Sequence, residues 1–148
     1  MTETHGAMIA KFLAAQDQVY PAALHELRAG RKESHWMWFI FPQLAGLGQS
    51  EMARHYALSG LDEARAYAAH PILWARLVEC TEAVLLHAPD SVAPRPLNAI
   101  FGSPDDKKFI SSMTLFSRAL PEDKLFRAAL SAFHDGHEDT RTVGLLAG

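Results

Sequence analysis

The sequence predicts an all-α protein, built as a single compact domain of many helices. Apolar residues recur at three- and four-residue steps along most of the chain, which is the spacing of a helix face packed on a core. Glycines, prolines and capping residues interrupt this pattern about every ten to twenty residues, as the ends of helices do. Because 148 residues is a usual size for one domain and no long linker is visible, we expect one domain over residues 1–148.

The N-terminal segment predicts one kinked helix or two short helices. Ile9, Phe12 and Tyr20 fall on one helix face, and Pro21 then interrupts the pattern. The apolar spacing resumes after this proline and continues to Gly30, a residue typical of a helix C-terminus.

The next apolar stretch, from Trp36 to Phe41, is the only one that resembles a strand. It is aromatic and apolar throughout, and periodicity does not distinguish a buried strand from a buried helix over so few residues. A strand needs a partner, and no second run of this kind is present. We therefore expect a buried core element, helical or extended, within an all-α domain.

The middle of the chain predicts three helices. One begins after Ser50, which is a favourable N-cap, and a second begins near Asp62. The longest begins at Pro71, where the missing N–H of proline costs nothing. The apolar stripe of this longest helix consists of Leu73, Leu77, Cys80 and Val84.

The C-terminal half predicts further helices after a proline-rich connection. Ser103 and Pro104, followed by two aspartates, are typical of an N-cap and a first helical turn. A second helix is expected to follow from Pro121 and to stop near Gly136, and the tail from Asp139 offers one more short helix. The first of these helices would bury Phe109, Met113, Phe116 and Leu120.

Composition and charge disfavour several classes of function. The chain has 14 basic and 17 acidic residues, and a formal net charge of −3 makes nucleic acid a poor partner. No stretch contains the roughly 20 apolar residues that a membrane span needs. The single cysteine, Cys80, has no partner for an intramolecular disulfide, and no secretory signal leads the chain, so we expect a cytoplasmic protein. The histidines show no metal-ligand spacing on one helix, and we expect no metal and no cofactor.

The densest polar and aromatic cluster follows Gly30. Arg31 and Lys32 offer a guanidinium and an ammonium to an anion, and His35 exchanges a proton near neutral pH. The indoles of Trp36 and Trp38 would give these groups a rigid aromatic platform. The alternative is a solvated basic turn followed by a core element, with His35 as an ordinary hydrogen-bonding residue.

A second cluster of polar side chains lies on the helix expected after Pro104. Lys107, Ser111 and Thr114 share one stripe at helical spacing, and Lys108 faces Ser112. Hydroxyls inside a helix are mildly unfavourable, so a group of them invites an explanation. Either they line a pocket and bind a ligand, or close helix packing lets them bond to their own backbone.

The arrangement of these residues resembles a known family. The string Gly30-Arg-Lys-x-Ser-His-Trp-Met-Trp-Phe-Ile-Phe-Pro-Gln43 is similar to the signature of domain of unknown function 1810 (DUF1810), a bacterial and fungal family. The resemblance extends to Ser50, Leu61-Asp-Glu-Ala64, His70-Pro71, Phe101-Gly102, Lys108, Ser111-Ser-Met-Thr-Leu-Phe116, Asp139 and Thr142. It implies a compact α-helical domain without an established activity.

Two features qualify what the resemblance implies. Some members of the family carry the label calpastatin, which names a disordered, repeat-built inhibitor and does not fit a chain that builds a core. Trp74 departs from the family pattern, in which a smaller residue is expected. A looser resemblance links Lys108-Phe109 to helical domains that process ADP-ribose and related nucleotide-sugar derivatives.

Together these observations favour a binding or processing site for a phosphorylated or nucleotide-like small molecule of the ADP-ribose type. In this hypothesis the anion is held by Arg31, Lys32 and Lys108 and is oriented by Ser111, Ser112 and Gln43. His35 is the acid or base, and Trp36 or Trp38 stacks on a ring of the ligand. The alternative hypothesis is a non-catalytic protein-interaction module, in which the tryptophan-rich run only builds the core.

Overall fold

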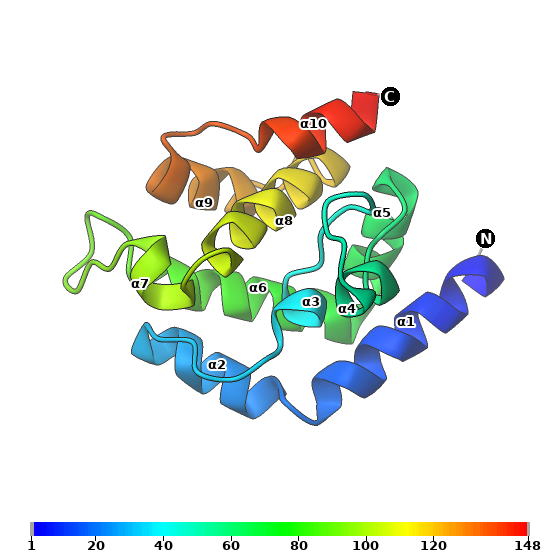
Figure 1. Ribbon diagram of the computed structural model, residues 1–148, viewed down its shortest axis with the longest axis horizontal. Helices are drawn as coiled ribbons and strands as arrows, with labels where there is room; N and C mark the ends of the chain where they lie inside the picture. Colours follow the sequence, from blue (N-terminus) through cyan, green and yellow to red (C-terminus); the bar gives the residue numbers. More distant parts are fainter. Residues whose placement is uncertain (1, 148) are drawn as a thin grey trace.

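A computed structural model describes residues 2–147, with the side chains of residues 2–4 left undescribed. The described part of the chain is helical and contains no sheet, with one isolated parallel bridge between Leu44 and Leu58 (Figure 1). The expected all-α fold is therefore confirmed. The helices are α1 (Thr2–Asp17), α2 (Tyr20–Ala29), α3 (Met37–Ile40), α4 (Glu51–His55), α5 (Leu61–Ala69), α6 (Pro71–Leu85), α7 (Leu97–Phe101), α8 (Asp105–Ala119), α9 (Leu125–His134) and α10 (Thr140–Ala147).

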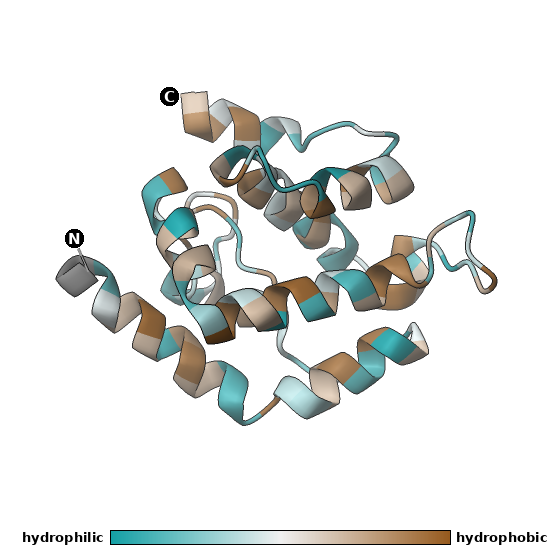
Figure 2. Cartoon of the chain, turned by 180° about the vertical axis from the view of Figure 1, so that it is seen from behind, coloured by the Kyte–Doolittle hydropathy of each residue, from teal (hydrophilic) through white to brown (hydrophobic). Residues whose placement is uncertain are grey.

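Two long helices, α6 and α8, organise the packing. Helix α6 contacts α2 on one side and α5 and α9 on others, while α8 contacts α5, α7, α9 and α10 (Figure 1). Most residues of α8 are buried, including the aromatic pair Phe109 and Phe116. Seen from behind, the connection between α6 and α7 projects from the edge of the molecule (Figure 2). Within residues 2–147, no helix combines the length and apolar composition that crossing a membrane requires.

The N-terminal segment forms two helices that meet at an angle, rather than one kinked helix (Figure 1). Pro21 lies in the first turn of α2, where its missing N–H breaks no helical hydrogen bond. Gly30 ends α2 with φ +80°, and the amide of Arg31 donates to the Glu26 carbonyl at 3.0 Å. A Cβ at Gly30 would lie 2.6 Å from the Cδ of Arg95, so both conformation and space favour glycine here.

The run from Trp36 to Phe41 is helical at its centre. The amides of Ile40 and Phe41 donate to the carbonyls of Trp36 and Met37, which closes the single turn of α3. Trp36 and Phe41 have no exposed surface. The segment is thus the buried core element that its composition predicts, and it is helical rather than extended.

Helix ends agree with the sequence in part. Ser50 accepts a hydrogen bond from the amide of Ala53 at 3.1 Å, as an N-cap does, and Pro71 opens α6. Ser103 does not cap α8, which begins at Asp105 after Pro104 and has no side-chain cap. Helix α9 begins at Leu125, four residues later than expected, because a turn closed by the Asp123 amide and the Leu120 carbonyl at 3.1 Å precedes it. The Asp123 carboxylate accepts the Leu125 amide at 3.0 Å from just before the N-cap, Lys124.

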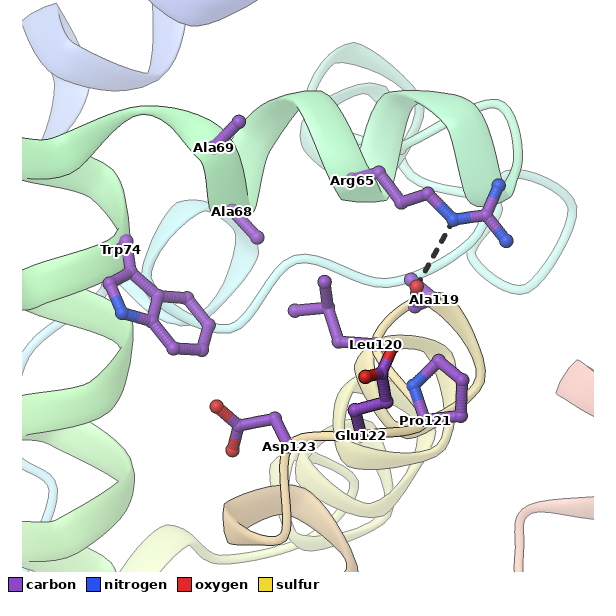
Figure 3. Close-up of a pocket in the computed structure, with 9 residues that line it drawn as sticks. All are labelled: Arg65, Ala68, Ala69, Trp74, Ala119, Leu120, Pro121, Glu122 and Asp123. Atoms are coloured by element: carbon purple, nitrogen blue, oxygen red, sulfur yellow. Dashed lines mark hydrogen bonds between the residues drawn. The ribbon is translucent and has the colours of Figure 1, made fainter.

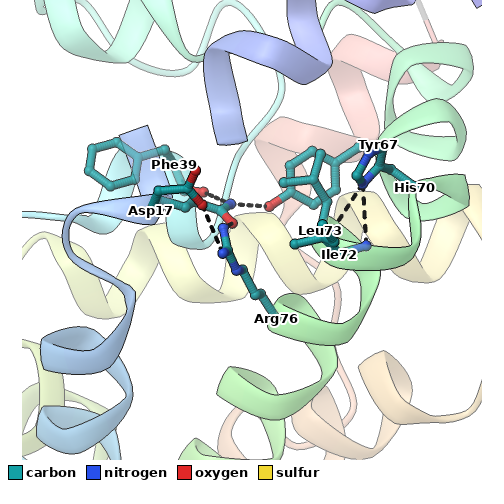
Figure 4. Close-up of polar contacts among 8 residues, drawn as sticks. Asp17, Phe39, Tyr67, His70, Ile72, Leu73 and Arg76 are labelled. Atoms are coloured by element: carbon teal, nitrogen blue, oxygen red, sulfur yellow. Dashed lines mark hydrogen bonds and ion pairs between the residues drawn. The ribbon is translucent and has the colours of Figure 1, made fainter. Parts of the chain in front are cut away.

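A buried polar network joins α1 and α3 to α5 and α6 (Figure 4). The side-chain amide nitrogen of Gln16, which is fully buried, donates to the Phe39 carbonyl at 2.7 Å and to the Tyr67 hydroxyl at 2.8 Å. The Arg76 guanidinium donates to the Gln16 amide oxygen at 3.3 Å and pairs with Asp17 at 2.8 Å. Because buried polar groups are costly when unpaired, this network fixes α1 relative to α3, α5 and α6.

Candidate ligand-binding site

Two lysines from distant parts of the chain meet at one carboxylate. The ammonium of Lys32 lies 3.1 Å from one oxygen of Asp105, and that of Lys108 lies 3.3 Å from the other. Asp105 and Lys108 are one turn apart on α8, while Lys32 comes from the segment after α2. The Lys32 side chain is only 9% exposed and that of Lys108 25%, so both charges are partly shielded from water. We call these three residues the lysine cluster.

The lysine cluster lies against the tryptophan-rich segment. The Lys32 ammonium is 5.2 Å from the centre of the Trp36 ring, and the Lys108 ammonium is 5.9 Å from that of Trp38. Both distances fall in the range of cation–π contacts. Trp36 is fully buried, whereas Trp38 is half-buried, so Trp38 is the indole that offers surface to a ligand.

Glu26 holds the backbone that leads into this segment. Its carboxylate accepts hydrogen bonds from the amides of Glu33 and Ser34 at 2.8 and 3.0 Å, and from the Ser34 hydroxyl at 2.6 Å. The indole nitrogen of Trp36 donates to the same carboxylate at 2.9 Å. Burial raises the pKa of the Glu26 carboxyl, but these hydrogen bonds outweigh it and bring the pKa down to about 2. Glu26 therefore stays ionised and orients the segment that carries Lys32.

The role of Glu26 was not foreseen from the sequence, although a signal exists. Glu26 follows Ala23 by one turn and precedes Gly30 by one turn, and both of these residues are buried. An acidic residue on the buried face of a predicted helix needs hydrogen-bond donors nearby. The run of amides and hydroxyls just after Gly30 can supply them.

The hydroxyls of α8 have mostly local partners. Ser111 donates to the Lys107 carbonyl at 3.1 Å and Thr114 to the Ile110 carbonyl at 2.9 Å, each one turn earlier on the same helix. Thr114 also accepts the amide of Asp139 at 2.9 Å. Ser112 is the exception, because its hydroxyl is fully buried and has no partner among the described residues.

The sequence also predicts Arg31, His35 and Gln43 for the site. Arg31 and His35 are exposed, and neither has a side-chain hydrogen bond or ion pair among the described residues. Gln43 is half-buried, and its carbonyl accepts the amide of Leu58 at 3.0 Å. Its side-chain nitrogen lies by the 46–50 turn, 3.9 Å from where a Cβ on Gly48 would be. The structure thus brings Lys32, Trp38 and Lys108 together and leaves Gln43 beside a different turn.

Several hollows of the surface are lined by residues that do not belong to the lysine cluster. One of them, about 950 Å³, lies between α1 and α5 and is lined mainly by apolar side chains such as Ile9 and Leu13. Within the described chain, no group of three or more His, Cys, Asp and Glu side chains is placed to hold a metal ion. The lysine cluster is a partly exposed site at the meeting of two segments.

Fold and site together define a small all-α domain that carries paired lysines beside a tryptophan-rich core segment. The chain belongs to the DUF1810 family, because residues 7–146 match the family model described as "Protein of unknown function (DUF1810)". A solved structure similar to it is the crystal structure of the conserved hypothetical protein Rv1873 from Mycobacterium tuberculosis at 1.38 Å. The two chains are 50% identical, the match covers 95% of this chain and 96% of that one, and the TM-score is 0.88. No curated protein matches the chain.

Proposed function

We propose that this protein binds a phosphorylated or nucleotide-like small molecule, of the ADP-ribose type, at the lysine cluster. The observation that carries the proposal is the convergence of two shielded ammonium groups, Lys32 and Lys108, on the single carboxylate of Asp105. The cluster keeps a net positive charge, and the exposed guanidinium of Arg31 lies just before it in the chain. A phosphate group has the oxygens and charge to engage both lysines at once.

Two neighbouring groups fit the rest of such a ligand. The half-buried Trp38 would stack on a base or sugar ring, since its indole lies beside the Lys108 ammonium. Ser112 follows Lys108 by one turn of α8, and its unpartnered hydroxyl, which is fully buried in the free protein, would donate to a ligand oxygen once the side chains that cover it move. Ser111 would orient the ligand less directly, because its hydroxyl already donates to the Lys107 carbonyl. Gln43 would orient the ligand only from a distance, because its side chain lies beside the 46–50 turn.

If the bound molecule is processed, His35 is the candidate acid or base. It is exposed, and it belongs to the segment that Glu26 and Trp36 hold in place. A histidine imidazole exchanges protons near neutral pH. The proposal places this binding in the cytoplasm, in keeping with a chain whose one cysteine is buried and free.

The experiment is a binding series on the full-length protein. Isothermal titration and thermal melting are run with ADP-ribose, ADP, a sugar phosphate and adenosine, and repeated on Lys32→Ala and Lys108→Ala. We expect a phosphorylated compound to raise the Tm in a concentration-dependent way, with adenosine inactive. Each substitution should weaken binding by about tenfold or more, the scale of one charge-assisted hydrogen bond.

Lys124→Ala is the matched control, because Lys124 is exposed and has no ion pair among the described residues. It removes one positive charge far from the cluster and should leave the affinity unchanged. Binding that weakens equally in all three variants would indicate non-specific charge attraction and would contradict the proposal. The absence of any binding would favour the alternative, an interaction module whose tryptophan-rich segment is purely structural.

A further inference from the structure

A second hollow, which shares Arg65 and Ala69 with the one between α1 and α5, lies between α5, α6 and the turn that joins α8 to α9 (Figure 3). Its volume is about 480 Å³. The floor and one wall are apolar and are formed by Ala68, Ala69 and Leu120. A hollow of this size accommodates a small organic molecule.

Trp74 forms the opposite wall. Its indole is half-buried, and its ring lies 5.9 Å from that of Phe126 in an edge-to-face contact, which holds its orientation. Figure 3 shows the six-membered ring of the indole directed across the hollow, toward the turn that carries Asp123. The indole therefore gives the hollow a rigid apolar wall against which the carbon skeleton of a ligand packs.

Two carboxylates lie across from the indole. Asp123 uses one oxygen to accept the amide of Leu125 at 3.0 Å, and its other oxygen has no partner among the described residues. In Figure 3 this carboxylate points toward Trp74. Glu122 precedes it, is exposed, and makes no ion pair within the described part of the chain. The hollow therefore carries two negative charges that no protein group neutralises by direct contact.

The one basic residue that lines the hollow is already engaged. The Arg65 guanidinium donates to the Ala119 carbonyl at 3.1 Å and pairs with Asp62 at 3.3 Å. Both contacts hold it at the far end of the hollow, away from the indole (Figure 3). An anionic ligand would thus meet two free carboxylates and an arginine that is occupied.

We propose that this hollow binds a small organic cation, specifically a primary ammonium carried on an apolar group. The ammonium would donate to the free oxygens of Asp123 and Glu122, because a carboxylate accepts N–H donors strongly. The apolar group would pack on Leu120 and the indole of Trp74. This site is separate from the lysine cluster and takes ligands of the opposite charge.

The test follows the indole N–H resonances of the protein in ¹H–¹⁵N NMR spectra during titration with benzylammonium. The chain has three tryptophans, and Trp74→Phe identifies which signal belongs to Trp74. We expect benzylammonium to shift the Trp74 signal in a saturable manner, while the signals of Trp36 and Trp38 stay in place. Benzyl alcohol, which has the same ring without the charge, and tetramethylammonium, which has the charge without N–H donors, should bind at least about tenfold more weakly.

Asp123→Asn is the decisive variant, because it keeps an oxygen that accepts the Leu125 amide while it removes the charge. It should weaken benzylammonium binding about tenfold, and Glu122→Gln should weaken it less because Glu122 is more exposed. Asp90→Asn, at an exposed position in the loop between α6 and α7, is the control and should change nothing. Equal binding of benzyl alcohol, or an unchanged affinity in Asp123→Asn, would overturn the proposal.

Discussion

The Glu26 carboxylate and the Trp36 indole are joined by a 2.9 Å hydrogen bond in the interior of the protein. This bond ties the end of α2 to the start of α3, across the segment that carries Arg31, Lys32 and His35. The same carboxylate also holds the Glu33 and Ser34 amides. One buried acid thus determines the course of the backbone on which the proposed ligand site depends.

Replacing Glu26 by glutamine should destabilise the protein strongly. A pKa lowered from 4.5 to about 2 corresponds to about 3 kcal/mol of differential interaction, and the glutamine NH₂ would face donors instead of acceptors. We expect Glu26→Gln to lower the free energy of unfolding by about 3 kcal/mol at pH 7, measured by urea denaturation. Glu82→Gln, on the exposed face of α6, is the control. A loss no larger than that of the control would show that the network does not contribute to stability.

The same carboxylate should make stability fall in acid. Because the pKa of Glu26 is lower in the folded protein than in the unfolded chain, its contribution is complete above the unfolded value of 4.5 and is lost as the pH falls from there toward about 2. Unfolding free energies of the wild type and Glu26→Gln, measured between pH 7 and pH 3, should therefore converge at low pH. Parallel curves would contradict the assignment.

Ser112 allows stability to be separated from binding. Its hydroxyl is buried without a partner, so Ser112→Ala should leave the unfolding free energy unchanged or raise it by up to about 1 kcal/mol. Thr114→Ala removes a hydroxyl that bonds to both Ile110 and Asp139, and this substitution should lower the unfolding free energy by about 2 kcal/mol. If Ser112 serves the ligand, Ser112→Ala should weaken phosphate-ligand binding in a protein of normal stability. A destabilised Ser112→Ala variant would indicate a structural partner instead.

Cys80 should be unreactive in the folded protein. Burial raises the pKa of its thiol from 9.0 to about 12, which lowers the thiolate fraction near neutral pH by about a thousandfold. Reaction with dithionitrobenzoate should be correspondingly slow in buffer and fast in denaturant, with a clean signal because the chain has one cysteine.

The control for this measurement is Ala75→Cys in a Cys80→Ala background. Ala75 lies on the exposed side of α6, so its replacement should react quickly without denaturant. Fast modification of Cys80 in the folded wild type would mean that α6 opens readily, or that the thiol is accessible.

Local features of the fold could be predicted because they depend on neighbours in sequence. Gly30 ends α2, Ser50 caps α4 and Pro71 opens α6, each through hydrogen bonds or dihedral angles within a few residues. Ser103 does not cap α8 because the chain turns before the helix starts, and α9 begins at Leu125 rather than at Pro121 because the Asp123 amide first closes a turn on the Leu120 carbonyl. Such shifts arise from competing local hydrogen bonds, which the spacing of apolar residues does not reveal.

The sequence by itself determined the all-α class, the order of the long helices and the burial of the run from Trp36 to Phe41, because apolar periodicity and capping chemistry act over a few residues. Only the tertiary structure decided that Lys32 and Lys108 share Asp105, that Trp38 rather than Trp36 offers surface, and that Glu26 organises their segment. Those relationships join residues of different helices. They depend on how the helices pack, since burial and the meeting of distant charges are properties of the packed chain and not of its local pattern.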